Sequence, residues 1–179
     1  HEKYFLYVGN AYPHKNLEAL LHAFSFFHKL HPNIHLVLAG RSDVFYQRLR
    51  KELHEIDVPD SVVTFVMNPS DQELALLYQH ASLYLFPSRC EGFGLPPLEA
   101  MSFGVPVIAS NTSCLPEILG QAALYFSPDD IEEMVEVMER VISDEGLLDE
   151  MSRRGQTQVK QYSWSQMAKE IQDIYESCA

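Results

Sequence analysis

The sequence predicts an α/β fold in which one parallel β-sheet of about six strands lies between layers of helices. Short apolar runs without polar alternation recur along the chain, which is typical of strands that are buried on both faces. Between these runs lie stretches with apolar residues at helical spacing, and several of them begin with a capping motif. Strands that alternate with helices in this way form parallel sheets, because each helix returns the chain to the same edge.

The strands are predicted from six apolar runs, at residues 4–8, 34–39, 62–66, 83–86, 105–109 and 123–126. Helices are predicted from residue 17 onwards, at 44–55, after the capping box Ser70–Glu73, before Gly104, and at 131–143, 147–161 and 163–179. The starts of the helices at 131–143 and 163–179 are predicted from caps. Ser127 would cap a helix with Pro128 at its first position, and Ser163 would form a capping box with Gln166.

The composition indicates a globular protein that does not bind nucleic acid. The 179 residues suit one domain, and 46% of them are hydrophobic, which is enough for a sizeable core. The net charge is −12, whereas a phosphate backbone is bound by basic surfaces. Three cysteines at unrelated spacings predict neither a disulfide framework nor a zinc site, and they favour a reducing, cytoplasmic compartment. We recognise no transmembrane run and no signal peptide, and a strand begins almost at once. We therefore expect the chain to be an excised part of a longer protein.

The clearest chemical signal is the stretch at residues 86–101, which leads from a strand through a loop with Gly92 and Gly94 into a helix. Glycine lets the backbone approach a ligand closely, and a helix N-terminus offers N–H groups and a positive dipole end to an anion. The stretch lacks the third glycine of the dinucleotide fingerprint and the Gly-Lys-Ser/Thr of a P-loop. As a bare pattern it fits an anion cradle or a simple tight turn.

Two carboxylates flank this loop. Glu99 is expected in the first turn of the following helix, where the dipole alone favours an acid. A functional Glu99 would instead face a neutral group, since it would repel phosphate, and a ribose diol fits that requirement. Glu91 is either solvated or bonded to a sugar, where it would stabilise positive charge that develops at the anomeric carbon.

Lys15 follows the first predicted strand and precedes a helix, where the dipole makes a purely solvated lysine unfavourable. The carboxyl ends of parallel strands meet at one edge, so a lysine there can face a diphosphate and neutralise a leaving group. The histidines His28, His31 and His35 lack a metal-ligand spacing, and no Asp-x-Asp pattern occurs. We therefore expect no metal and no cofactor.

The chain resembles one large family most closely in the stretch Glu91-Gly92-Phe93-Gly94-Leu95-Pro96-Pro97-Leu98-Glu99-Ala100-Met101. This is similar to the Glu-x7-Glu motif of the retaining "group 1" glycosyltransferases, also called glycosyltransferase family 4. Further segments fit that family in order, namely Tyr7-Val8-Gly9, His14-Lys15-Asn16, and residues 74–86, 104–110, 115–117 and 128–130. The resemblance implies the Rossmann-like C-terminal half of the two-domain GT-B fold.

The domain organisation follows from the same resemblance. Residues 1–179 would form the donor-binding domain, and residues 163–179 would form a helix that crosses back to an N-terminal acceptor domain, which this chain does not contain. We therefore expect the chain alone to bind donor weakly and to transfer little or no sugar.

The resemblance also implies roles for single residues. Lys15 would bind the donor diphosphate and Glu91 the donor sugar, as the two catalytic residues, while Glu99 would hold the ribose. The residues expected to complete the donor site are Gly9, Asn10, His14, Arg41, Met67, Asn68, Gly92, Phe93, Gly94 and Leu95. Among these, Met67 and Asn68 would border the base, and the backbone N–H groups of residues 93–95 would contact phosphate and sugar. Many relatives carry arginine where this chain has Asn10 and His14, and Arg41 is a candidate to replace that charge.

The function implied is transfer of a hexosyl group from a nucleoside diphosphate sugar to a hydroxyl acceptor in polysaccharide or glycolipid assembly. Mannose from a GDP donor is the first expectation and UDP the alternative, with the full-length enzyme cytoplasmic and peripheral at the inner face of a membrane. Two other functions stay open: another GT-B enzyme, such as an epimerase or a phosphorylase, and a non-catalytic binding module.

Overall fold

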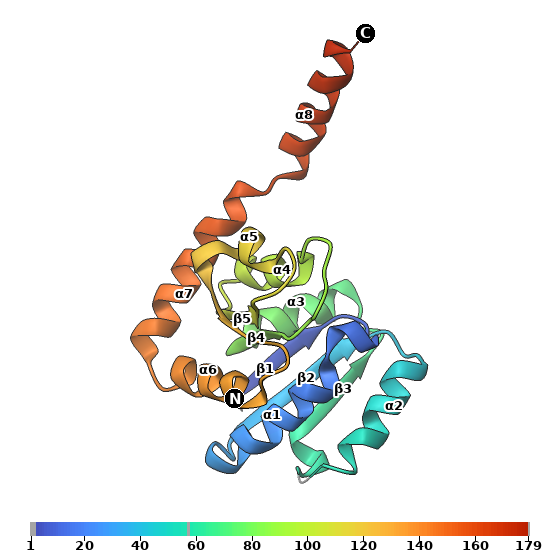
Figure 1. Cartoon of the computed structure of the whole chain (residues 1–179), viewed down its shortest axis with the longest axis vertical. Helices are drawn as coiled ribbons and strands as arrows, with labels where there is room; N and C mark the ends of the chain where they lie inside the picture. Colours follow the sequence, from blue (N-terminus) through green and yellow to red (C-terminus); the bar gives the residue numbers. More distant parts are fainter. Residues whose placement is uncertain (1–2, 57, 179) are drawn as a thin grey trace.

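The computed structural model describes residues 3–56 and 58–178. At its centre is one sheet of six parallel strands in the order β3-β2-β1-β4-β5-β6 (Figure 1). The strands are β1 (Lys3–Val8), β2 (Ile34–Gly40), β3 (Val63–Met67), β4 (Leu83–Phe86), β5 (Val107–Ser110) and β6 (Ala123–Phe126). Each strand overlaps one of the predicted apolar runs, so the predicted parallel sheet is confirmed.

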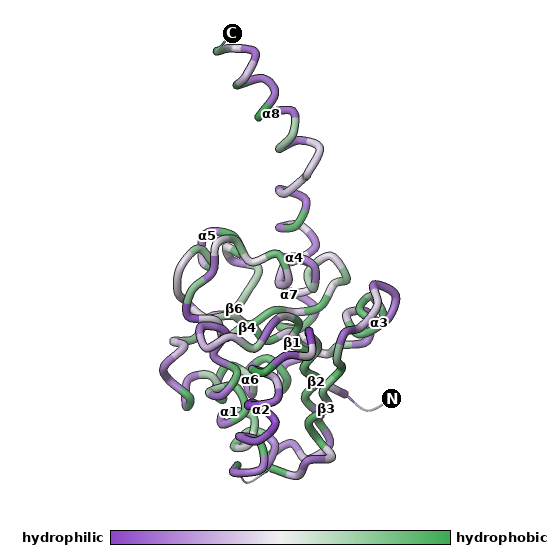
Figure 2. Tube along the Cα trace, turned by 90° about the vertical axis from the view of Figure 1, so that its right-hand side faces the viewer, coloured by the Kyte–Doolittle hydropathy of each residue, from purple (hydrophilic) through white to green (hydrophobic). Residues whose placement is uncertain are grey.

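Helices cover both faces of this sheet, as predicted. They are α1 (Leu17–Leu30), α2 (Val44–Leu53), α3 (Asp71–His80), α4 (Leu95–Ser102), α5 (Leu115–Leu119), α6 (Ile131–Ile142), α7 (Glu145–Gln158) and α8 (Trp164–Ser177). One layer contains α1, α2 and α6, and the opposite layer contains α3, α4 and α7 (Figures 1 and 2). The short helix α5 was not predicted from the sequence.

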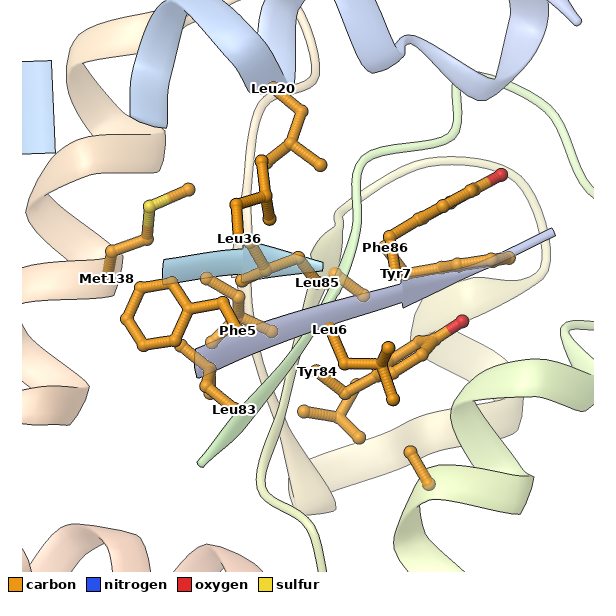
Figure 3. Packing of buried hydrophobic residues seen from close by; sticks show 14 of the residues in the cluster. Phe5, Leu6, Tyr7, Leu20, Leu36, Leu83, Tyr84, Leu85, Phe86 and Met138 are labelled. Carbon is orange, nitrogen blue, oxygen red and sulfur yellow. The ribbon is translucent and has the colours of Figure 1, made fainter. Parts of the chain in front are cut away.

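The two central strands, β1 and β4, contribute fully buried aromatic side chains to the core. Phe5, Tyr7, Tyr84 and Phe86 are fully buried there, and burial of each such ring stabilises the fold by about 1.5–3 kcal/mol. The rings of Tyr7 and Phe86 stack with their centroids 6.3 Å apart (Figure 3). This packing fixes the relative position of the two loops that leave β1 and β4.

The helix starts show which capping motifs operate. The predicted capping box of α3 is present, with bonds in both directions between Ser70 and Glu73. The predicted Ser127 cap of α6 is wrong, because the Asp130 side chain accepts the bond from the N–H of Glu133 instead. Ser127 lies in a loop, where its N–H donates to the Glu133 carboxylate at 2.6 Å.

Helix α8 extends away from the rest of the molecule (Figures 1 and 2). None of its described residues is buried, and its exposed apolar side chains are Trp164, Met167, Ile171, Ile174 and Tyr175. Ser163 caps the helix as predicted, but the Gln166 amide donates to Glu170 and so does not complete the expected box. A helix at 163–179 was predicted, and its last residue lies outside the described part. Its contact with another domain stays a prediction.

Within residues 3–56 and 58–178, no helix combines the length and the apolar character that are needed to cross a lipid bilayer.

Candidate functional site

The sheet has a topological switch point between β1 and β4. From β1 the strand order proceeds outward to β2 and β3 on one side, and from β4 to β5 and β6 on the other. In open parallel sheets, ligands bind in the crevice outside the carboxyl ends of the strands at such a point. The loops that leave β1 and β4 meet here, and the N–H of Arg89 donates to the His14 carbonyl at 2.8 Å.

Lys15 and Glu91 form an ion pair in this crevice, with Nζ 2.6 Å from Oε1. The two side chains are only 14% and 11% exposed, so the interpretation of either as a solvated side chain is wrong. Lys15 ends the short helical turn Pro13–Lys15, and its Nζ lies 5.7 Å from the centre of the Phe86 ring, within cation–π range. The pairing itself was not predicted, since the two residues were expected to contact different parts of one ligand.

Asn16 holds Lys15 in place by joining three loops. Its Nδ2 donates to the carbonyl of Pro87 after β4 at 3.2 Å and to that of Pro128 after β6 at 2.7 Å. Asn16 is buried and has a left-handed backbone with φ of 61°, which asparagine tolerates better than most residues. This role of Asn16 was not predicted, because nothing in the local sequence pattern indicates partners 71 and 112 positions away.

The backbone of Glu91 is held from the loop after β5. The Ser113 hydroxyl donates to the Glu91 carbonyl at 2.7 Å and accepts from the Glu91 N–H at 3.2 Å. The Cys114 thiol lies 3.3 Å from the same carbonyl. Ser113 was not predicted as a site residue, and the only signal for it in the sequence is its place at the carboxyl edge just after the fifth strand.

The glycine loop provides free backbone donors. Gly94 precedes α4 with φ of 99°, and an added Cβ would lie 3.0 Å from a methyl group of Leu115, so glycine is needed there. Around Gly92 an added Cβ would meet nothing within 4 Å, so that side of the loop is open. The N–H groups of Phe93, Gly94 and Leu95 donate to none of the described residues. Together with the positive end of α4, they form a suitable anion site.

Glu99 lies in the second turn of α4, so its predicted place in the first turn is wrong. The helix begins before the two prolines, at Leu95, and the dipole at its N-terminus therefore does not account for this carboxylate. The side chain of Glu99 is exposed, and its Oε2 accepts a hydrogen bond from the Tyr78 hydroxyl at 2.9 Å.

The remaining predicted residues follow the same edge. The carbonyls of Gly9 and Asn10 accept from the hydroxyls of Tyr46 and Tyr7, at 2.9 and 2.7 Å. These bonds fix the first turn after β1. His14 is exposed, and only its carbonyl takes part in the contact with Arg89 described above.

Arg41, Met67 and Asn68 lie at the ends of β2 and β3. The N–H of Asn68 donates to the Gly40 carbonyl at 2.7 Å, and its Oδ1 accepts from the N–H of Ser42 at 3.0 Å. Arg41 is exposed and makes no hydrogen bond or ion pair with another described residue. The structure thus brings Lys15 and Glu91 into contact, and it leaves these three residues along the edge without contact to that pair.

Comparisons with known proteins place the chain in a family. Residues 1–158 match the sequence model of the family described as glycosyl transferases group 1. O-antigen chain mannosyltransferase B of Escherichia coli is 33% identical over 177 residues, which are 96% of this chain and 45% of that protein. O-antigen chain mannosyltransferase RfbU of Salmonella typhimurium is 38% identical over 131 residues, covering 72% of this chain and 35% of the relative. The chain therefore spans less than half the length of these relatives.

Two solved structures share the fold. Sucrose-phosphate synthase from Thermosynechococcus elongatus superposes with a TM-score of 0.88 at 28% identity, over 99% of this chain and 45% of that one. The C-terminal domain of the group 1 protein LpcC from Francisella tularensis has a TM-score of 0.76 at 22% identity, over 89% of this chain and 84% of that one. The architecture is that of the C-terminal, Rossmann-like half of the GT-B fold. By its sequence and its fold, the chain belongs to the glycosyl transferases group 1 family.

Proposed function

We propose that this chain is the donor-binding half of a retaining mannosyltransferase and that it binds a nucleoside diphosphate sugar between the loops after β1 and β4. The observation that carries the proposal is the Lys15–Glu91 pair at 2.6 Å at the switch point of the sheet. A sugar nucleotide needs a cation for its diphosphate, donors for its phosphate oxygens and acceptors for its hydroxyls. Lys15, the free N–H groups before α4, Glu91 and Glu99 supply such a set.

In this proposal the donor replaces the ion pair. The Lys15 ammonium pairs with the diphosphate instead of with the Glu91 carboxylate. During transfer, the N-terminal end of α4 stabilises the negative charge on the departing diphosphate. Glu91 is then free to accept hydrogen bonds from the sugar, and Glu99 accepts from the ribose. Met67 and Asn68 would border the base, and no metal or cofactor is required.

The transfer breaks the bond between the anomeric carbon and the donor phosphate and forms a bond from that carbon to the acceptor oxygen. For retention, both events occur on the same face of the sugar, and the acceptor proton passes to the departing diphosphate. The acceptor would be held by an N-terminal domain. This accords with the length of the relatives, since the chain spans less than half of each.

The names of the relatives support mannose as the sugar. We take GDP as the first candidate nucleotide and UDP as the second. They favour a transferase over an epimerase, a phosphorylase or a binding module. The proposed setting of the full-length protein is O-antigen or related polysaccharide assembly, on the cytoplasmic side and at the inner face of a membrane.

Calorimetric titration of the chain with GDP, UDP and ADP tests the proposal. We expect one of them to bind weakly and Glu99→Ala to weaken it by about 1–2 kcal/mol, because hydrogen bonds to a charged group are lost. Glu136→Ala, at an exposed position on α6, is the matched control and leaves the affinity unchanged. If no nucleotide binds at millimolar concentration, the donor site is wrong, whereas an unchanged affinity in Glu99→Ala removes only Glu99 from the ribose.

A further inference from the structure

Tyr78 contacts Glu99, the carboxylate that is proposed to hold the ribose. Its hydroxyl donates to Oε2 of Glu99 at 2.9 Å, from the last turn of α3 to the second turn of α4. We propose that Tyr78 is a positioning residue for ribose recognition: it fixes one oxygen of Glu99 and directs the other to the ribose diol. This inference rests on the proposed function and assigns a role to a residue that does not itself touch the donor.

The ring of Tyr78 is held on two sides. It is 2% exposed, and its centroid lies 5.5 Å from that of Phe103 at an interplanar angle of 14°. On another side the Tyr84 ring lies 5.9 Å away. Phe103 immediately follows α4, so the same ring that bonds Glu99 also packs against the end of the helix that carries Glu99. The hydroxyl therefore has a fixed direction relative to the carboxylate.

The hydroxyl of Tyr78 remains a proton donor under all ordinary conditions. Burial, and secondly the nearby negative charge of Glu99, raise its pKa far above the usual value for tyrosine. In the structure Oε2 of Glu99 accepts from this hydroxyl, while Oε1 accepts from none of the described residues. A vicinal diol offers two adjacent O–H donors, and a carboxylate with a fixed orientation receives them without losing further side-chain freedom.

This role predicts a loss of specificity, which a merely structural role would not produce. If Glu99 faces the diol because of Tyr78, removing the Tyr78 hydroxyl reduces the contribution of the ribose 2′-OH to the affinity for the nucleotide. A tyrosine that only packs α3 against α4 would alter stability and leave the preference for ribose over deoxyribose unchanged.

The experiment compares the affinities of GDP and 2′-deoxy-GDP for the wild-type chain and for Tyr78→Phe by calorimetry, with the UDP pair if UDP is preferred. We expect the wild type to prefer the ribonucleotide by about fivefold or more, and Tyr78→Phe to bring that ratio close to one. Phe keeps the stacking on Phe103, so the fold is retained. Phe103→Leu, which loosens the ring but keeps the hydroxyl, provides a second variant and should lower the ratio in part.

Tyr4→Phe is the matched control, because the Tyr4 hydroxyl donates to the Leu77 carbonyl of the same helix at 2.7 Å and does not contact Glu99. It should leave the ratio at its wild-type value. An unchanged ratio in Tyr78→Phe overturns this inference alone. A wild-type ratio of one overturns this inference and also removes Glu99 from the ribose, while nucleotide binding itself would still stand. Failure of the wild type to bind any of the nucleotides overturns the proposed function and this inference with it.

Discussion

The Lys15 ammonium lies 2.6 Å from the Glu91 carboxylate, although 76 positions separate the two residues in the chain. Both side chains are largely withdrawn from water, so the attraction between them is weakly screened. In the structure, the cation expected to bind a diphosphate is therefore neutralised by the carboxylate expected to bind the sugar. We therefore expect both the stability of the chain and its affinity for the donor to depend on this pair.

The first prediction concerns stability. Lys15→Met leaves the Glu91 charge in a poorly solvated position without its partner, and we expect the free energy of unfolding to fall by about 2–4 kcal/mol. The double variant Lys15→Met/Glu91→Gln removes that unpaired charge and should recover part of the loss. Urea denaturation of the two single variants and the double variant measures the coupling. Strictly additive effects would contradict an energetic role for the pair.

The second prediction concerns affinity. Glu91→Gln removes the negative charge that competes with a diphosphate for Lys15, so GDP without a sugar should bind about threefold or more tightly than to the wild type. GDP-mannose should gain less, because its sugar loses the carboxylate. Calorimetry on both ligands gives the comparison. Weaker binding of GDP to Glu91→Gln would mean that Glu91 does not compete for Lys15.

The third prediction separates the contribution of the Asn16 side-chain hydrogen bonds from that of its left-handed backbone conformation. Asn16→Gly keeps a residue that tolerates φ of 61° but loses both side-chain bonds, to Pro87 and Pro128. We expect a cost of about 1–3 kcal/mol from the two carbonyls left without this donor. Asn16→Ala should cost about 1 kcal/mol more, since alanine resists the left-handed conformation. Urea denaturation is the measurement, and equal costs for glycine and alanine would show that the backbone conformation contributes nothing.

The sheet was predictable because strands buried on both faces leave uninterrupted apolar runs, and every described strand, from β1 to β6, overlaps one of these runs. The edge where the site lies followed from the same reasoning, since the carboxyl ends of parallel strands coincide. Lys15 and Glu91 were therefore assigned to one edge from the sequence alone. Their direct contact was not predictable, because it depends on side-chain directions in two loops.

The predicted place of Glu99 in the first turn of α4 is wrong because the helix begins earlier than that placement requires, with Pro96 and Pro97 inside its first turn. The first helical N–H groups have no intrahelical partner, so prolines are accepted inside the first turn, and the helix begins at Leu95. That shift moved Glu99 into the second turn. Tyr78 and Asn16 were missed for another reason: their partners lie 21 positions away or more, and no local pattern encodes them.

The fourth prediction concerns alkaline pH. Tyr125 in β6 donates to the Gly120 carbonyl at 2.6 Å, and burial, with a smaller contribution from the charge of Tyr162, raises its pKa to about 12. Burial shifts the pKa upward in the same way for Tyr4, Tyr7, Tyr46, Tyr78 and Tyr84. An unfolded tyrosine titrates near pH 10, so the folded chain binds these protons more tightly than the unfolded chain.

It follows that the stability contributed by Tyr125 is fully present below about pH 10 and is lost as the pH rises from about 10 to about 12. The free energy of unfolding, measured in urea at about pH 8, 10 and 11, should therefore decline only at the alkaline end. Tyr125→Phe should make that decline shallower, because one raised pKa no longer contributes. Tyr175→Phe, at a position that is 72% exposed, is the control and should keep the wild-type slope. If the free energy of unfolding falls with pH equally steeply in the wild type and in Tyr125→Phe, the Tyr125 proton is not linked to folding.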